Sequence, residues 1–254
     1  MCGFVGVLSD FGQESVNIDQ QFERMNNAIV HRGPDDSGYY VDNHIQLGFR
    51  RLSIIDIESG SQPLSYEDER YWIVFNGEIY NYIELRNVLE NDGYTFKTSS
   101  DTEVILALYC SRKEKMLDSL RGMFSFLIWD REEKQLFGAR DPFGIKPLYY
   151  LELSNKIYFA SERKSIVLGT DHEFINGESL HHYLTFQYVP EPSTMSRDIM
   201  KVEPGHYFIK KPKEQLVIKS YWKPKFKPVR NEFTKLKNEL TDALYNSVNM
   251  HMRS

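Results

Sequence analysis

The sequence predicts an α+β fold in which antiparallel sheets are covered by helices on the outside. Stretches with strand character and stretches with helical periodicity come in blocks, and do not alternate strictly as they do in a parallel sheet. Four strand-like stretches follow one another between residues 123 and 161 with short intervals. The 254 residues are 41% hydrophobic and 26% charged, which is ordinary for a globular protein with a sizeable core.

The expected strands are short apolar runs, many of them rich in β-branched and aromatic residues. In chain order they are residues 4–9, 39–41, 45–49, 71–75, 123–130, 135–140, 148–153, 156–161, 205–210 and 216–221. The last two suggest a final hairpin. The run at 71–75 halts at Asn76-Gly77, a dipeptide typical of a turn.

The expected helices have apolar residues at three- and four-residue spacings. They cover residues 19–30, 82–91, 101–113, 161–167, 178–185 and 231–252. Ser99, Ser100 and Asp101 are the candidates for the N-cap of the third helix.

The last helix follows a linker, residues 223–230, and arrives after the main domain, residues 2–222, is complete. One of its faces is apolar along its whole length and needs a partner. That face consists of Phe233, Leu236, Leu240, Leu244, Val248 and Met252. The helix either packs back on the domain or belongs to something else, and we favour the second interpretation.

Composition excludes several classes of function. The net charge of −5 argues against nucleic-acid binding through a basic surface. No apolar run is long enough for a transmembrane helix, and the start does not resemble a signal peptide. The two cysteines, Cys2 and Cys110, form no disulfide framework and favour a reducing, cytoplasmic compartment. No Cys/His cluster has the spacing of a metal site, and Cys110 is expected to pack in a helix.

Cys2 is the residue with the most specific chemical potential. A small residue at position 2 allows the initiator methionine to be removed, which would leave Cys2 with a free α-amine beside its thiol. An α-amine has a pKa near ~7.7–8.0, so part of it is a neutral base at pH 7. A nucleophile activated by the chain's own amine is an established catalytic arrangement. The alternative is that Cys2 is a small buried hydrophobic residue.

Cys2 is one of several segments that together carry a family resemblance. The others are Arg51-Leu52-Ser53-Ile54-Ile55-Asp56, Asn76-Gly77-Glu78, Ser100-Asp101-Thr102-Glu103, Arg140-Asp141-Pro142-Phe143-Gly144 and His31-Arg32-Gly33-Pro34-Asp35. In this order the segments resemble the glutaminase domain of class II glutamine amidotransferases, most closely that of asparagine synthetases. The resemblance implies a four-layer αββα N-terminal-nucleophile hydrolase sandwich, and hydrolysis of the L-glutamine side-chain amide to glutamate and ammonia.

The resemblance also implies roles for individual residues. Cys2 would be the nucleophile that forms a thioester, and Asn76 and Gly77 would donate hydrogen bonds to the oxyanion. Arg51 would pair with the substrate α-carboxylate, and Asp101 would hold the α-ammonium.

Further residues of the substrate pocket follow from the same resemblance. Glu78 would assist at the α-ammonium, and Leu52, Ser53, Ile54 and Ile55 would line the pocket. The segments at 31–35 and 140–144 are interpreted as framework with no chemical role. Asn-Gly is most often a hairpin turn, and Asp101 is also a helix-cap candidate, so each motif has a purely structural alternative.

The resemblance extends to what lies beyond the glutaminase domain. Residues 231–254 resemble the start of a synthetase domain, and the chain lacks the Ser-Gly-Gly-x-Asp-Ser loop that binds ATP in that domain. We therefore expect no cofactor or metal for the glutaminase reaction, and ATP and Mg only for a synthetase domain. The expected partners are glutamine and that domain, with a homodimer as an option and with no nucleic acid and no membrane.

Two alternatives stay open at this stage. The domain could supply ammonia to another acceptor, such as a sugar phosphate. It could also be a non-catalytic binding or regulatory module, which retention of Met1 would favour.

Overall fold

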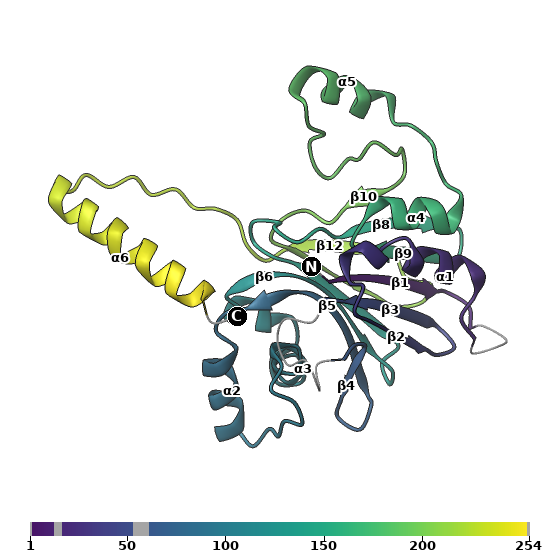
Figure 1. The fold of residues 1–254 in the computed structure, drawn as a ribbon, viewed down its shortest axis with the longest axis horizontal. Coiled ribbons are helices and arrows are strands. Elements are labelled where there is room, and N and C mark those ends of the chain that lie inside the picture. Colours follow the sequence, from purple (N-terminus) through teal and green to yellow (C-terminus); the bar gives the residue numbers. More distant parts are fainter. Residues whose placement is uncertain (1, 13–16, 53–60, 253–254) are drawn as a thin grey trace.

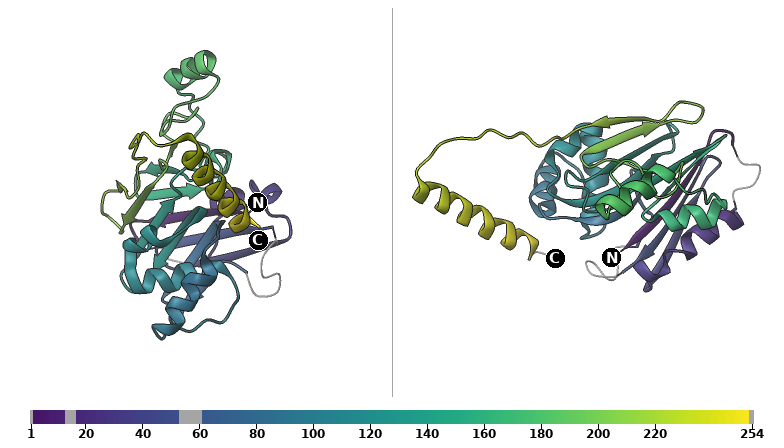
Figure 2. Two further views of the ribbon diagram at one scale, coloured as in Figure 1. Left: turned by 90° about the vertical axis from the view of Figure 1, so that its left-hand side faces the viewer. Right: turned by 90° about the horizontal axis from the view of Figure 1, so that it is seen from above.

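The computed structural model describes residues 2–12, 17–52 and 61–252. Two six-stranded antiparallel sheets form its centre (Figures 1 and 2). The first has the order β10-β8-β9-β1-β3-β2 and the second the order β12-β11-β7-β6-β5-β4. The strands of the first sheet are β10 (Met200–Lys201), β8 (Tyr149–Leu153), β9 (Lys156–Ala160), β1 (Gly3–Ser9), β3 (Ile45–Arg51) and β2 (Asp36–Val41). Those of the second are β12 (Val217–Ser220), β11 (His206–Lys210), β7 (Gln135–Arg140), β6 (Gly122–Asp130), β5 (Tyr71–Ile79) and β4 (Leu64–Tyr66).

The structure has six α-helices in its described ranges, and four of them cover the outer faces of the sheets. The helices are α1 (Gln20–Asn27), α2 (Tyr82–Asn91), α3 (Asp101–Arg112), α4 (Arg163–Thr170), α5 (Gly177–Phe186) and α6 (Phe233–His251), with short 3-10 helices η1 (Val30–Arg32) and η2 (Lys113–Ser119). Helices α1 and α4 lie against the first sheet, whereas α2 and α3 lie on the side of the second (Figure 1).

Three buried apolar clusters separate the four layers. Side chains of both sheets meet in the central cluster, which includes Phe4, Val74 and Phe208. A second cluster joins the outer face of the second sheet to α3, and a third joins the first sheet to α1 and α4. Cys110 packs at the edge of the second cluster, as expected. The predicted α+β four-layer sandwich is therefore confirmed.

Most predicted elements occur within a few residues of their expected ends, but the prediction of a turn at Asn76-Gly77 is wrong. Strand β5 runs through both residues to Ile79, and Asn76 and Gly77 pair with Ser125 and Phe124 of β6. The long partner strand keeps this dipeptide extended, against its local preference for a turn. The short edge strand β4 was not predicted.

The third helix is capped by only one of the three candidates. The Ser100 hydroxyl accepts the Thr102 N–H at 2.9 Å, and Asp101 is the first helical residue. The interpretation of Asp101 as a helix cap is therefore wrong, and its carboxylate instead accepts the Ile79 N–H.

Helix α6 stands apart at the end of an extended segment (Figure 1), and none of its residues is buried. Its apolar stripe is exposed, with Leu240 at 62% and Met252 at 75%. It touches the domain through the rings of His251 and Tyr80, whose centroids are 4.1 Å apart. The assignment of this helix to a second domain stays a prediction. No helix in the described ranges is both long and apolar enough to cross a membrane.

Candidate active site

A cavity of about 310 Å³ opens where β1, β3, β5 and α3 converge. Its volume is at the lower end of the range usual for small-molecule sites. The predicted residues that line it are Cys2, Arg51, Leu52, Asn76, Gly77, Glu78 and Asp101. Residues separated by up to 99 positions in the chain thus meet at one cavity.

Cys2 lies directly before β1 and is held from two sides. Strand β1 pairs with β3 so that Gly3 faces Arg50, which brings Cys2 beside the end of β3. The Cys2 Sγ lies 3.4 Å from the Leu52 nitrogen and 3.5 Å from the Leu52 oxygen. On the other side, Arg32 Nε donates to the Cys2 carbonyl at 2.9 Å. The thiol is therefore fixed at the cavity wall.

The backbone N–H of Gly77 points toward the β4 edge of β5. The residue opposite Gly77 on β6 is Phe124. The Phe124 carbonyl accepts the Asp141 N–H and the Phe124 N–H donates to the Asp141 carboxylate, so the Phe124 backbone faces β7. Opposed residues of an antiparallel pair either bond each other or both face away. The Gly77 backbone therefore faces away from β6, on the edge beyond the end of β4.

The amides on both sides of Gly77 along this edge are already bonded to side chains. Phe75 N–H donates to Gln62 Oε1 at 2.7 Å, and Ile79 N–H donates to Asp101 Oδ2 at 3.0 Å. A Cβ at Gly77 would lie 2.2 Å from the Met123 oxygen, so no larger residue fits without a backbone shift. The cavity wall thus places the Gly77 N–H between two occupied donors.

The Asn76 side chain is a buried amide with an unused donor. Asn76 is 1% exposed, and within the described part of the chain its Nδ2 is buried with no hydrogen-bond partner. Burial of an unpaired N–H is costly, and such a group calls for an explanation. Asn76 and Gly77 thus bring a side-chain N–H and a backbone N–H to the same cavity.

Arg51 ends β3 and is 6% exposed. Gly33 allows the preceding loop to cross directly behind it, because a Cβ at Gly33 would lie 2.4 Å from the Arg51 nitrogen. The Asp35 N–H then donates to the Arg51 carbonyl at 3.0 Å. The His31–Asp35 segment therefore packs against this strand end, which agrees with its interpretation as framework.

Asp101 is 6% exposed and faces the same cavity. Burial raises the pKa of its carboxyl to about 6, with a further increase from Glu78, while hydrogen bonds from the Ile79 and Thr102 backbone oppose the increase. At neutral pH the group is a buried anion without a cation among these causes. Such a carboxylate suits a cationic ligand group.

Several residues that contact this site were given no role from the sequence. Arg32, in the segment interpreted as framework, bonds the Cys2 carbonyl and pairs with Glu162 at 3.0 Å. Lys146 and its neighbour Ile145 line the cavity directly after the 140–144 segment. No motif assigned chemistry to these residues, so only the fold reveals their contacts with the site.

Three predicted pocket residues, Ser53, Ile54 and Ile55, lie outside the described residues. In the ranges the structure describes, no group of three or more His, Cys, Asp or Glu side chains could hold a metal ion.

The sequence of the chain was compared with those of known proteins. Residues 1–222 match the family described as glutamine amidotransferase domain. The chain is 56% identical to the Bacillus subtilis protein named asparagine synthetase [glutamine-hydrolyzing] 1, over all of this chain and 40% of that protein. It is 39% identical to a putative asparagine synthetase [glutamine-hydrolyzing] of Mycobacterium tuberculosis, over all of this chain and 42% of that protein. The chain thus spans about 40% of the length of these relatives.

Solved structures share the fold at low identity. The glutamine phosphoribosylpyrophosphate amidotransferase of B. subtilis superposes with a TM-score of 0.62 and 20% identity, covering 87% of this chain and 49% of that one. A structure described as the allosteric regulatory enzyme of purine biosynthesis gives a TM-score of 0.65 and 21% identity over the same shares.

Proposed function

The chain belongs to the family of glutamine amidotransferase domains, and from this premise we propose that its cavity hydrolyses the side-chain amide of L-glutamine through a thioester on Cys2. The observation that carries the proposal is the position of the Cys2 thiol at one cavity with the unpaired Asn76 amide and the Gly77 backbone. A nucleophile and two fixed donors are what acyl transfer needs.

The proposed reaction begins once Met1 has been removed. The Cys2 α-amine takes the thiol proton, directly or through one water, and the sulfur attacks the amide carbon. The resulting oxyanion accepts hydrogen bonds from Asn76 Nδ2 and the Gly77 N–H. The ammonium then returns the proton to the leaving nitrogen, and ammonia departs from the thioester. Water attacks the thioester with help from the same amine, which releases glutamate and restores the thiol.

Substrate recognition is proposed for the charged residues of the same cavity. Arg51 would hold the α-carboxylate with its planar guanidinium, and Asp101, supported by Glu78, would hold the α-ammonium. The two charges lie on different elements, β3 and α3, so a ligand must carry both groups at a fixed separation to satisfy them. This arrangement favours a free amino acid over an amide within a peptide.

The acceptor of the ammonia is a proposal about a longer protein. The curated relatives named above are glutamine-hydrolysing asparagine synthetases, and this chain matches only part of each. We propose that the glutaminase domain feeds such a synthetase domain, which would use ATP and Mg, while glutamine hydrolysis uses no cofactor. A cytoplasmic location, as the two cysteines suggest, belongs to the same proposal.

Glutamate release from glutamine tests the proposal directly. Intact mass first establishes that Met1 is absent, and the processed protein is then assayed with Cys2→Ala and Cys110→Ala variants. We expect Cys2→Ala to abolish release and Cys110→Ala to retain it, because Cys110 packs away from the cavity. A diazo-ketone analogue of glutamine should add its mass to Cys2 alone. Release that survives in Cys2→Ala, or a processed protein that releases nothing, would contradict the proposal.

A further inference from the structure

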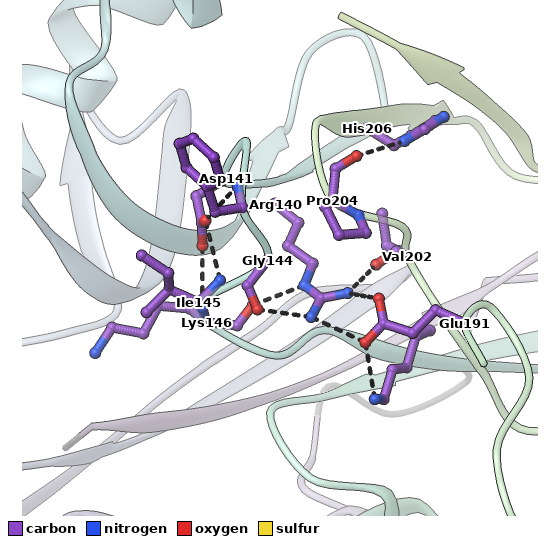
Figure 3. A network of polar contacts seen from close by, with 11 residues as sticks. Arg140, Asp141, Gly144, Ile145, Lys146, Glu191, Val202, Pro204 and His206 are labelled. Carbon is purple, nitrogen blue, oxygen red and sulfur yellow. Dashed lines mark hydrogen bonds and ion pairs between the residues drawn. The ribbon is translucent and has the colours of Figure 1, made fainter. Parts of the chain in front are cut away.

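The segment that carries Lys146 is fixed by one buried carboxylate. Asp141 is 0% exposed, and its Oδ1 accepts the N–H groups of Phe143 and Ile145, each at 3.0 Å. Its Oδ2 accepts the Lys146 N–H at 2.9 Å (Figure 3). The same oxygen accepts the Phe124 N–H of β6 at 3.2 Å. One side chain thereby folds the loop into a single shape and ties it to the second sheet.

The preceding residue holds the same loop from the other side. Arg140 Nε donates to the Lys146 carbonyl and Nη2 to the Gly144 carbonyl, both at 2.8 Å. Its Nη1 donates to the Val202 carbonyl at 2.6 Å and pairs with Glu191 at 2.7 Å (Figure 3). Both the N–H and the carbonyl of Lys146 are therefore bonded, so the start of its side chain has a fixed direction.

The Lys146 side chain extends away from the Arg140 guanidinium, as Figure 3 shows. It lines the cavity together with Cys2, Asn76 and Gly77, and the residue is only 5% exposed. Lysine is almost never fully buried unless its charge is paired, so the charges that face Lys146 decide what it can do. Its four-carbon stem packs in the wall while its ammonium belongs to the cavity's charges.

The charges around Lys146 come from several elements. Burial and Arg32 lower the pKa of Lys146, whereas Cys2, Glu78 and Asp141 raise it. Arg51 and Asp101 line the same cavity. The charge of Lys146 is therefore coupled to that of Cys2 as well as to those of Arg32, Glu78 and Asp141.

We propose that Lys146 is a further residue of the glutamine reaction, whose ammonium stabilises negative charge that develops beside Cys2. This inference rests on the proposed function. Negative charge occurs there three times: on the attacking sulfur, on the oxyanion, and on the γ-carboxylate of the glutamate product. The ammonium stabilises each as a fixed charge in a site that excludes much of the water, and it neither gains nor loses a proton in the reaction.

This role affects catalysis and substrate binding differently. The γ-amide of glutamine is neutral, so Lys146 contributes little to glutamine affinity. The transition state and the product are anionic at that position, so both are stabilised. Lys146 consequently affects kcat and the affinity for glutamate, and leaves the KM for glutamine nearly unchanged.

The first experiment compares Lys146→Met, Lys146→Arg and the exposed-lysine control Lys219→Met. Methionine keeps the length and the apolar packing of the stem and removes the charge. We expect kcat to fall roughly tenfold or more in Lys146→Met, less than the ~10²–10³-fold typical of a lost direct oxyanion donor. Lys146→Arg should recover most of kcat and, since arginine stays protonated, should retain activity to higher pH than the wild type.

The second experiment measures glutamate and glutamine binding by calorimetry in the Cys2→Ala background, where no turnover occurs. Adding Lys146→Met should weaken glutamate binding about tenfold and change glutamine binding by less than about twofold. Equal weakening of both ligands would assign Lys146 a merely structural role and overturn the inference. So would an unchanged kcat in Lys146→Met while the wild type is active. An inactive wild type would instead overturn the proposed function, and the glutamate comparison would still decide the role of Lys146.

Discussion

Two groups of residues line the cavity, and they offer different chemistry. Arg51 and Asp101 carry formal charges, at the terminus of a strand and in the first turn of a helix. Cys2, Asn76 and Gly77 offer a thiol, a neutral side-chain amide and a backbone N–H. The charged group suits a substrate that is already charged, whereas the neutral group suits charge that appears only during the reaction. Changes in the two groups should therefore separate KM from kcat.

The largest expected effect is that of Asn76→Ala on kcat. Removal of one oxyanion donor typically lowers kcat by ~10²–10³-fold, or about 3–4 kcal/mol. The KM for glutamine should change by less than about threefold, and thermal unfolding should not occur earlier, because the lost N–H has no partner in the described structure. Steady-state kinetics and a melting curve provide both numbers.

Asn26 offers a matched control for this variant. It is also fully buried, and its side-chain amide likewise has no partner among the described residues, but it lies on α1 in the outer layer. Asn26→Ala should leave kcat unchanged. If both variants lower kcat to the same degree, the special role of Asn76 fails.

The next largest effect is expected from Arg51→Lys, on the KM for glutamine. An ammonium replaces a fork that can bond both oxygens of a carboxylate, so we expect KM to rise about tenfold or more with a smaller change in kcat. The neighbouring residue is the control, since Arg50 donates to the Asn26 carbonyl and the Asn27 side chain on α1. A rise in KM for Arg50→Lys in place of Arg51→Lys would assign the α-carboxylate contact to Arg50.

Much of the sandwich could be predicted because apolar periodicity and the pairing of long strands agree. Strand β6 reads clearly as a strand and is one, with the predicted bounds shifted by a single residue. The Asn76-Gly77 dipeptide shows where local reasoning fails. Its preference for a turn is a local property of about four residues. The nine consecutive residue pairs between β5 and β6 outweigh that preference and keep the strand extended. The same pairing leaves no room for a Cβ at Gly77, so the glycine is required by packing and not by a turn.

The site could be predicted only as far as its motifs reach. Cys2, Arg51, Asn76 and Asp101 belong to recognisable segments, and they meet at one cavity. Lys146 could not be found in this way, because its position depends on hydrogen bonds made by the two residues that begin its loop. A lysine in a loop is normally a solvated surface charge. Only the fold turns it into the cavity wall.

The smallest expected effect concerns the pH dependence of the protein's stability, through Asp101. The folded-state pKa of Asp101 is about 6, above its ordinary value of 3.8. Folding therefore favours the protonated form, and the wild type loses stability as pH rises from about 4 through 6. The shift corresponds to at most about 3 kcal/mol at neutral pH.

Asp101→Asn removes this penalty and keeps an oxygen that can accept the Ile79 N–H. We expect the variant to be about 1–2 kcal/mol more stable than the wild type at pH 7.5, with the difference vanishing near pH 4. Denaturant unfolding at both pH values measures it, with Asp130→Asn as a buried carboxylate control that pairs with Arg70 and should destabilise instead. The same Asp101→Asn variant should lose affinity for glutamine. A variant that is less stable at pH 7.5 would mean that Asp101 serves the fold; a gain in stability with a loss of glutamine binding would mean that this buried charge is kept for its ligand.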